Sequence, residues 1–182
     1  MQGNINFEDL PRAERTTVRI FRTPLPERDE GFVPRLAEGF GLGGPVEGDA
    51  AIAAVEDRAS RLEVYTASRS LRWKLLGDAT SEPVEPADLP DERDAIRLAD
   101  AFLQEHGLAH ELARVRSVSD TVVTRIDEGG QQAAYPITRH VDYGFSLDGL
   151  EVFGPGAKIQ VTFDQPDRAC EVLHFWREVE EE

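Results

Sequence analysis

Hydrophobic and polar residues alternate along many short stretches of this chain, and residues typical of turns separate the stretches. The last third shows the pattern most clearly. Segments rich in β-forming residues at 150–153, 158–164 and 169–178 are bounded by the turn sequences DG, GPG and QPD. This pattern predicts consecutive antiparallel strands over residues 143–177, around which we expect the rest of the chain to be arranged.

The same alternation predicts strands earlier in the chain. We place them at residues 16–23, 50–55, 61–66, 71–76, 114–117, 121–127 and 133–145. The segments 61–66 and 71–76 are joined by only four residues, so we expect them to form a hairpin.

Two stretches have the periodicity of a helix instead. Phe32, Leu36 and Phe40 recur every four residues, with Asp29 as a candidate N-cap and a glycine-rich stop at 41–44. The second stretch is longer and begins at Asp91, another candidate N-cap, and Gly107 follows its end. Its apolar stripe consists of Ile96, Ala99, Phe102 and Leu103.

Residues 80–90 separate two similar arrangements of elements. This stretch is rich in proline and acidic residues and has no periodicity, which is typical of a linker. A helix followed by antiparallel strands occurs on each side of it. We therefore predict an N-terminal unit at 1–79, a linker at 80–90 and a C-terminal unit at 91–182. The predicted fold class is α+β, with helices packed on curved antiparallel sheets in two related helix-plus-sheet units.

Composition excludes several classes of function. The chain has 182 residues, of which 40% are hydrophobic, so it can bury a core. Its net charge of −15 would repel a phosphate backbone, and we expect no nucleic-acid partner. No apolar run is long enough to span a bilayer, so we expect no membrane insertion. The compartment stays open: extracytoplasmic if a signal or anchor has been removed, and cytoplasmic otherwise.

Few residue clusters suggest catalysis or metal binding. Strand alternation puts His140 and Asp142 on one face and Tyr143 on the other. A histidine beside a carboxylate has the residue types of a general base and its orienting partner, and Tyr143 alone is a second candidate for proton transfer. Polar residues on the outer face of a half-exposed sheet are nevertheless the ordinary case. His106 and His110 are four residues apart without a third ligand, so we expect no metal and no cofactor.

Aromatic residues are the other candidates for a site. Phe145 and Trp176 belong to a set that we assign first to the core. A curved sheet packed over a helix also leaves a concave mouth, and such mouths hold small apolar ligands. Phe145 and Trp176 are therefore our candidate ligand-binding residues.

The second helix and the strands after it also carry a family resemblance. The relevant positions are Ala99, Phe102, Gly107, Leu108, Phe145, Leu147, Asp148, Gly149, Leu150, Val152, Gly154, Gly156, Ile159 and Val161. In these residues the chain resembles the cystatin-like and PepSY-like units that occur in tandem in extracytoplasmic bacterial proteins, above all the YycH/YycI-type regulatory proteins and related lipoproteins. The resemblance implies a non-catalytic binding or inhibitory role and transfers no catalytic residue.

Two functions follow as hypotheses. The first is a non-catalytic regulatory module that binds a protein or peptide partner. The alternative is a small-molecule enzyme of the cyclase or isomerase type, with a pocket in the concave sheet. A pocket of several hundred cubic ångströms lined by Tyr143, Phe145, Trp176 and a titratable group would favour the enzyme. A filled core with an exposed strand edge would favour the binding module.

Overall fold

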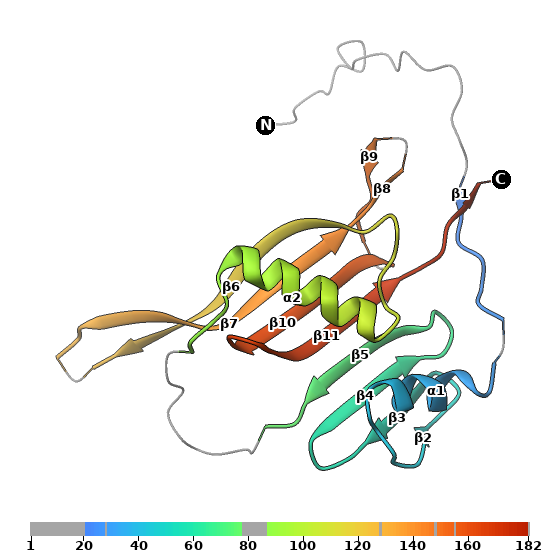
Figure 1. Cartoon of the computed structure of the whole chain (residues 1–182), viewed down its shortest axis with the longest axis horizontal. Helices are drawn as coiled ribbons and strands as arrows, with labels where there is room; N and C mark the ends of the chain where they lie inside the picture. The colour runs from blue at the N-terminus through green and yellow to red at the C-terminus, as the bar shows by residue number, and fades with distance from the viewer. Residues whose placement is uncertain are drawn as a thin grey trace, which may run out of the picture.

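Antiparallel β-structure dominates the computed structural model, which describes residues 21–27, 29–77, 87–127, 129–147, 149–154 and 156–181. Strands account for 48% of the structure and two short helices for 15%. Figure 1 shows one broad sheet with both helices lying against it. Within the described ranges, no helix is long and apolar enough to cross a membrane.

The main sheet has eight strands in the order β2-β3-β4-β5-β11-β10-β7-β6, and every neighbouring pair is antiparallel. Their bounds are β2 (Glu47–Gly48), β3 (Ile52–Glu56), β4 (Ser60–Tyr65), β5 (Ser70–Leu75), β6 (Arg114–Ile126), β7 (Gln132–Gly144), β10 (Ala157–Gln165) and β11 (Arg168–Trp176). The two halves of the chain meet where β5 pairs with β11, with Trp73 opposite Val172. Both halves therefore belong to one continuous sheet.

Two small ribbons complete the β-structure of the described residues. β1 (Phe21–Arg22) pairs with β12 (Glu180–Glu181), so the first and last described strands lie side by side. β8 (Ser146–Leu147) pairs with β9 (Leu150–Glu151), and Figure 1 shows this ribbon projecting from the sheet. Gly149 in the turn of this ribbon has a φ of +77°, which explains why the turn needs glycine.

The helices α1 (Phe32–Gly39) and α2 (Glu92–Glu105) form where the periodicity predicts them. Asp91 caps α2 as predicted, because its side chain accepts the N–H of Asp94 at 2.8 Å. The prediction of Asp29 as the cap of α1 is wrong. The N-cap is Gly31, and the Asp29 carboxylate instead accepts the Gly31 N–H at 2.9 Å.

Both helices contribute to a single hydrophobic core. Phe40, just after α1, lies 6.2 Å from Phe102 of α2 and 5.3 Å from Trp73 of β5, measured between ring centroids. Alternate residues of the sheet point into this core, as the period of two requires. The fully buried large side chains are Val55, Leu62, Val64, Leu71, Val141, Ile159, Val161, Phe163 and Val172.

The predicted fold class is wrong. The protein is predominantly antiparallel β with one eight-stranded sheet, whereas we expected an α+β fold of helices packed on curved sheets in two related units. The sheet owes its size to the pairing of β5 with β11, across which the side chains of Arg72 and Glu171, 99 positions apart along the chain, bond to each other. Hydrophobic periodicity reports local structure, so it carries no information about that pairing.

Several predicted features lie outside the described residues. They include residues 16–20 of the first predicted strand, 80–86 of the predicted linker, and Asp148 and Pro155 in the turns near the C-terminus. The division into an N-terminal unit at 1–79, a linker at 80–90 and a C-terminal unit at 91–182 stays a prediction.

Candidate functional site

His140 lies on the sheet in a shell of threonines. Its Nε2 is 2.7 Å from Thr121 Oγ1 and 3.1 Å from Thr138 Oγ1, and its Nδ1 is 3.0 Å from Thr162 Oγ1. Both ring nitrogens therefore have hydroxyl partners on neighbouring strands. This arrangement holds the ring in place against the sheet.

Asp142 shares the face of His140, as predicted, but has other partners. One carboxylate oxygen accepts from Gln160 at 2.8 Å and lies 3.3 Å from the Lys158 ammonium group. The other is 3.5 Å from Ser117 Oγ. The two residues of the proposed acid–base pair are thus neighbours on one face, each bound to different groups.

Tyr143 lies on the opposite face, inside the core. Its side chain is 4% exposed, and its hydroxyl donates to Asp100 of α2 at 2.8 Å. Burial, reinforced by the Asp100 carboxylate, raises the pKa of Tyr143 above its ordinary value. The phenol stays protonated and ties α2 to β7, so the structure does not bring Tyr143 to the His140–Asp142 pair.

The predicted aromatic pair does come together. The rings of Phe145 and Trp176 are 4.6 Å apart between centroids, and both side chains are nearly buried. The Trp176 ring also lies 4.6 Å from the ring of His110. Phe145 belongs to the core, whereas Trp176 reaches the wall of a pocket.

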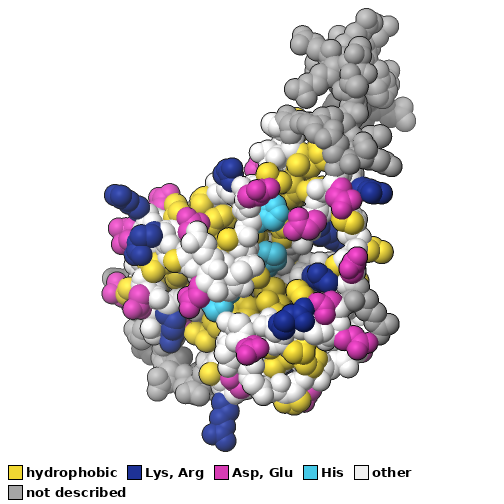
Figure 2. Space-filling view, turned by 45° about the vertical axis from the view of Figure 1, so that its right-hand side comes forward, with side chains coloured by type: hydrophobic (Ala, Val, Ile, Leu, Met, Phe, Trp, Pro, Cys, Tyr) yellow, Lys and Arg dark blue, Asp and Glu magenta, His cyan; other side chains and the backbone are white. Residues whose placement is uncertain are grey.

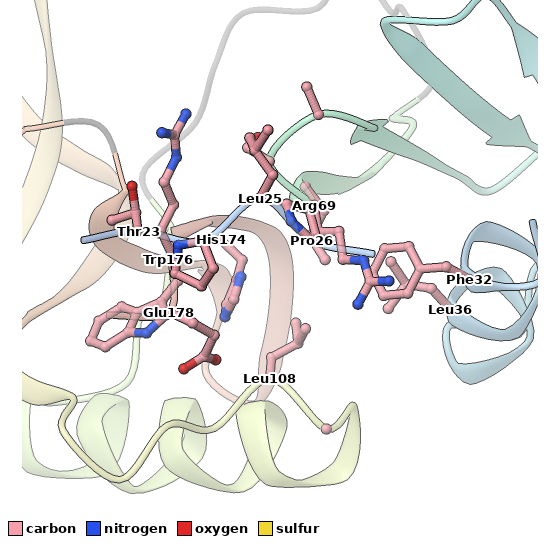
Figure 3. A pocket seen from close by; sticks show the side chains of 16 residues that line it. Thr23, Leu25, Pro26, Phe32, Leu36, Arg69, Leu108, His174, Trp176 and Glu178 are labelled. Atoms are coloured by element: carbon pink, nitrogen blue, oxygen red, sulfur yellow. The ribbon is translucent and has the colours of Figure 1, made fainter. Parts of the chain in front are cut away.

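This pocket has a volume of about 320 Å³ and lies at the end of β11. Five separate parts of the chain form it: the extended segment at 23–26, α1, the turn between β4 and β5, the start of the α2–β6 connection, and the end of β11 with the residues after it. Figure 3 shows His174, Trp176 and Glu178 on one side, Phe32 and Leu36 on the opposite side, and Leu108 between them. Figure 2 shows histidine side chains along a hollow that is bordered by hydrophobic ones.

Two polar groups in the pocket wall have no hydrogen-bond partner among the described residues. They are Nε1 of Trp176, whose side chain is 5% exposed, and Nδ1 of His174. Burial lowers the pKa of His174 to about 4, and the nearby His110 acts in the same direction. The His174 ring is therefore neutral at neutral pH.

Charged side chains surround the mouth of the pocket. Arg69 donates to the carbonyl of Glu27 at 2.7 Å, and its guanidinium carbon lies 4.7 Å from the centre of the Phe32 ring. Arg177 is exposed. The Glu178 carboxylate is turned to His110, whose Nε2 lies 3.4 Å away.

Sequence reasoning found Trp176 but missed the other residues of this pocket. His174 lies two positions before Trp176 on one strand, so alternation alone would have placed both on one face. Arg69 and Phe32 come from distant parts of the chain, and no sequence signal links them to Trp176.

The second candidate site is the edge formed by β6. This strand has 13 residues and pairs only with β7, and no strand in the described part of the chain pairs with its outer edge. The predicted strands at 114–117 and 121–127 are parts of this single strand. Its exposed hydrophobic side chains include Val122 and Ile126, which are 54% and 62% exposed.

The distal half of β6 also extends beyond the sheet. β10 pairs with β7 only as far as Arg139, so among the described strands residues 132–138 of β7 pair with β6 alone. One backbone bond reaches this part from elsewhere, because the Ala87 N–H donates to the Pro136 carbonyl at 3.2 Å. Figure 1 shows this part as a two-stranded arm that projects from the molecule. A two-stranded ribbon is marginally stable in water, so a third strand would stabilise the arm.

Neither a reactive cysteine nor a metal site is indicated among the described residues. Burial is the main cause that raises the pKa of the Cys170 thiol to about 12, which makes it a poor nucleophile at neutral pH. Among the described residues, no three histidine, cysteine or acidic side chains are grouped closely enough to hold a metal ion.

Comparison with protein-family models, with curated proteins and with solved structures finds no match to this chain. Function is therefore inferred from the β6 edge, the pocket and the residues around them.

Proposed function

We propose that the protein is a non-catalytic binding module whose partner is an extended polypeptide segment that pairs with the outer edge of β6. The observation that carries this proposal is the length and exposure of that edge: 13 residues, unpaired on one side within the described residues, ending in a projecting arm. An edge of this kind offers a row of backbone donors and acceptors to an added strand.

Side chains on the arm add an apolar contribution. Val122 and Ile126 expose more than half of their surface, although both belong to the large hydrophobic residues that proteins usually bury. Covering one such side chain is worth roughly 1.5–3 kcal/mol when burial is complete. A bound strand would thus gain affinity from backbone pairing and specificity from the side chains that meet these positions.

The charge of β6 indicates the chemistry of the partner. The strand contains three arginines and one aspartate, in a chain whose net charge is −15. The Arg139 guanidinium makes two bonds of 2.7 and 2.8 Å to that aspartate, Asp120, and lowers its pKa. Arg116 is already paired with Glu151 at 2.6 Å, whereas Arg114 donates to the carbonyls of Glu111 and Ala113. A segment with alternating apolar and acidic residues would therefore find its cationic partner at Arg114.

Two features support binding over the enzyme alternative. Tyr143 and Phe145 are both buried, and the pocket that contains Trp176 is lined by neither of them. A second hollow of about 280 Å³ is lined by Phe145 but by neither Tyr143 nor Trp176. The partners of His140 are threonine hydroxyls on the same sheet. A regulatory role, as implied by the resemblance to YycH/YycI-type proteins, is part of the same proposal.

The test uses a peptide of about eight residues with alternating valine and glutamate, long enough to span a typical strand. We expect it to bind in about 0.15 M salt, where charges beyond ~8 Å are screened. A version with N-methyl groups on alternate residues cannot complete the backbone ladder and should not bind. Equal binding of the two peptides would refute strand addition.

A matched pair of variants locates the binding site. Val122→Asp should weaken peptide binding roughly tenfold or more, because it replaces apolar contact with like-charge repulsion. Val46→Asp is the control, since Val46 is 48% exposed and precedes β2 at the opposite edge of the sheet. Equal effects of the two substitutions would refute the assignment to β6. A stable dimer in sedimentation that Val122→Asp dissociates would assign the edge to a second copy instead.

A further inference from the structure

We propose that the pocket at the end of β11 is a separate binding site for a small organic acid, a molecule with one apolar body and one carboxylate. Its volume of about 320 Å³ lies at the lower end of the range for small-molecule sites, roughly 300–1,000 Å³. The site is independent of the β6 edge and of the partner proposed there.

The apolar body would lie between the helices and the sheet. Phe32 and Leu36 of α1 face the pocket from one side, and Leu108, after α2, lies between them and β11. Leu71 of β5 also lines the pocket and is itself 1% exposed. Side chains of this kind favour an aliphatic chain or a flat ring over a polar molecule.

The buried indole nitrogen requires an acceptor. Nε1 of Trp176 can only donate a hydrogen bond, and a buried donor without a partner is costly. No described residue accepts from this nitrogen, which is closed to solvent, so a ligand oxygen reaches it once the ring turns towards the pocket. Nδ1 of the neutral His174 ring, another residue that lines the pocket, is likewise buried and without a partner among the described residues.

The charges at the mouth favour an anion. Arg69 and Arg177 both line the pocket, against one carboxylate, Glu178, which is exposed and turned to His110. The backbone of Arg69 has a φ of +53°, a left-handed conformation that costs energy for any residue except glycine. In this conformation the Arg69 guanidinium donates to the Glu27 carbonyl and lies over the Phe32 ring. These two contacts keep its positive charge beside the pocket.

Three probes with the same apolar chain test the proposal: octanoate, 1-octanol and octylamine. Each is titrated into the full protein while NMR follows the indole N–H signals, with the Trp176 signal assigned by its loss in Trp176→Phe. We expect octanoate to move the Trp176 signal and to bind at least about tenfold more tightly than octanol, because its oxygens are charged acceptors. Equal affinity for octanol would reduce the site to an apolar groove, and tighter binding of octylamine would show that Glu178 dominates. Either result, or an unmoved Trp176 signal, overturns the proposal.

Two exposed arginines give a variant pair that should keep the fold intact. Arg177→Gln should weaken octanoate binding roughly two- to fivefold, as expected for an exposed ion pair, and leave octanol unchanged. Arg97→Gln, on α2 and outside the pocket, should change neither. A Val122→Asp variant that binds octanoate normally would show that the pocket acts independently of the β6 edge. If Arg177→Gln and Arg97→Gln have the same effect, the carboxylate is not bound where we propose.

Discussion

Replacing Leu62 with alanine tests whether the two halves of the chain fold as one unit. Leu62 is 0% exposed at the centre of β4, opposite Val55 on β3 and Trp73 on β5. Leu→Ala substitutions in cores cost about 2–5 kcal/mol, depending on how far the surroundings can collapse. Both neighbours are themselves nearly buried, at 1% and 7% exposure, so little collapse is available and we expect about 3–5 kcal/mol.

The assay combines calorimetry with residue-level hydrogen exchange. For a chain of this size the expected loss lowers the melting temperature by roughly 6–20 °C, and a single transition should remain. Because β4 and β10 belong to one sheet, exchange in β10 should accelerate as much as in β4. Leu150→Ala, at a side chain that is 71% exposed, is the control and should stay within about 0.5 kcal/mol of the parent. Two transitions, or acceleration confined to β4, would show that 1–79 and 91–182 fold as separate units.

Two further substitutions test the contacts of buried polar groups. Tyr143→Phe removes the hydrogen bond to the Asp100 carboxylate and should cost roughly 1.5–3 kcal/mol in urea unfolding at pH 7, and a cost below about 0.5 kcal/mol would contradict this role. His174 has a folded-state pKa of about 4, below the ordinary value of 6.5, because it is buried. As the pH falls from 6.5 to 4, the unfolded chain therefore binds a proton that the folded protein does not, and stability should fall by at most about 3 kcal/mol. His174→Gln should lack this part of the pH dependence of stability. If the stability of parent and variant changes identically with pH, His174 is not the group that titrates.

Local structure could be predicted well from the sequence because its causes are local. Asp91 and Gly107 mark the ends of α2, the first through a side-chain cap and the second through a φ of +66°. The predicted hairpin at 61–66 and 71–76 is observed as β4 and β5, each beginning one residue earlier. Each of these features depends on residues within a few positions of one another.

The arrangement of the sheet could not be predicted in the same way. The predicted division at 80–90 leaves open whether the two halves share one sheet, and the structure answers this because β5 pairs directly with β11. The residues that meet there, such as Trp73 and Val172, are ordinary buried sheet residues. Many other strand pairings would bury these two side chains equally well. The pairing that forms is therefore decided by competition among all long-range pairings and not by the residues of one strand.

Only the local part of each candidate site could be predicted from the sequence. Alternation correctly placed His140 and Asp142 on one face and Tyr143 on the other, since these residues belong to one strand. The pocket combines Trp176 with side chains from four other parts of the chain. Such a combination exists only after the sheet has formed.

The most direct test of the proposed function is hydrogen exchange along β6, with and without the valine–glutamate peptide. Roughly half of the amides of an antiparallel edge strand point outwards. We predict that those of β6 exchange rapidly in the free protein and become protected on binding, while β2 at the opposite edge is unchanged. Protection confined to residues around Trp176, or β6 amides that exchange equally fast in both states, would contradict pairing of a partner strand with this edge.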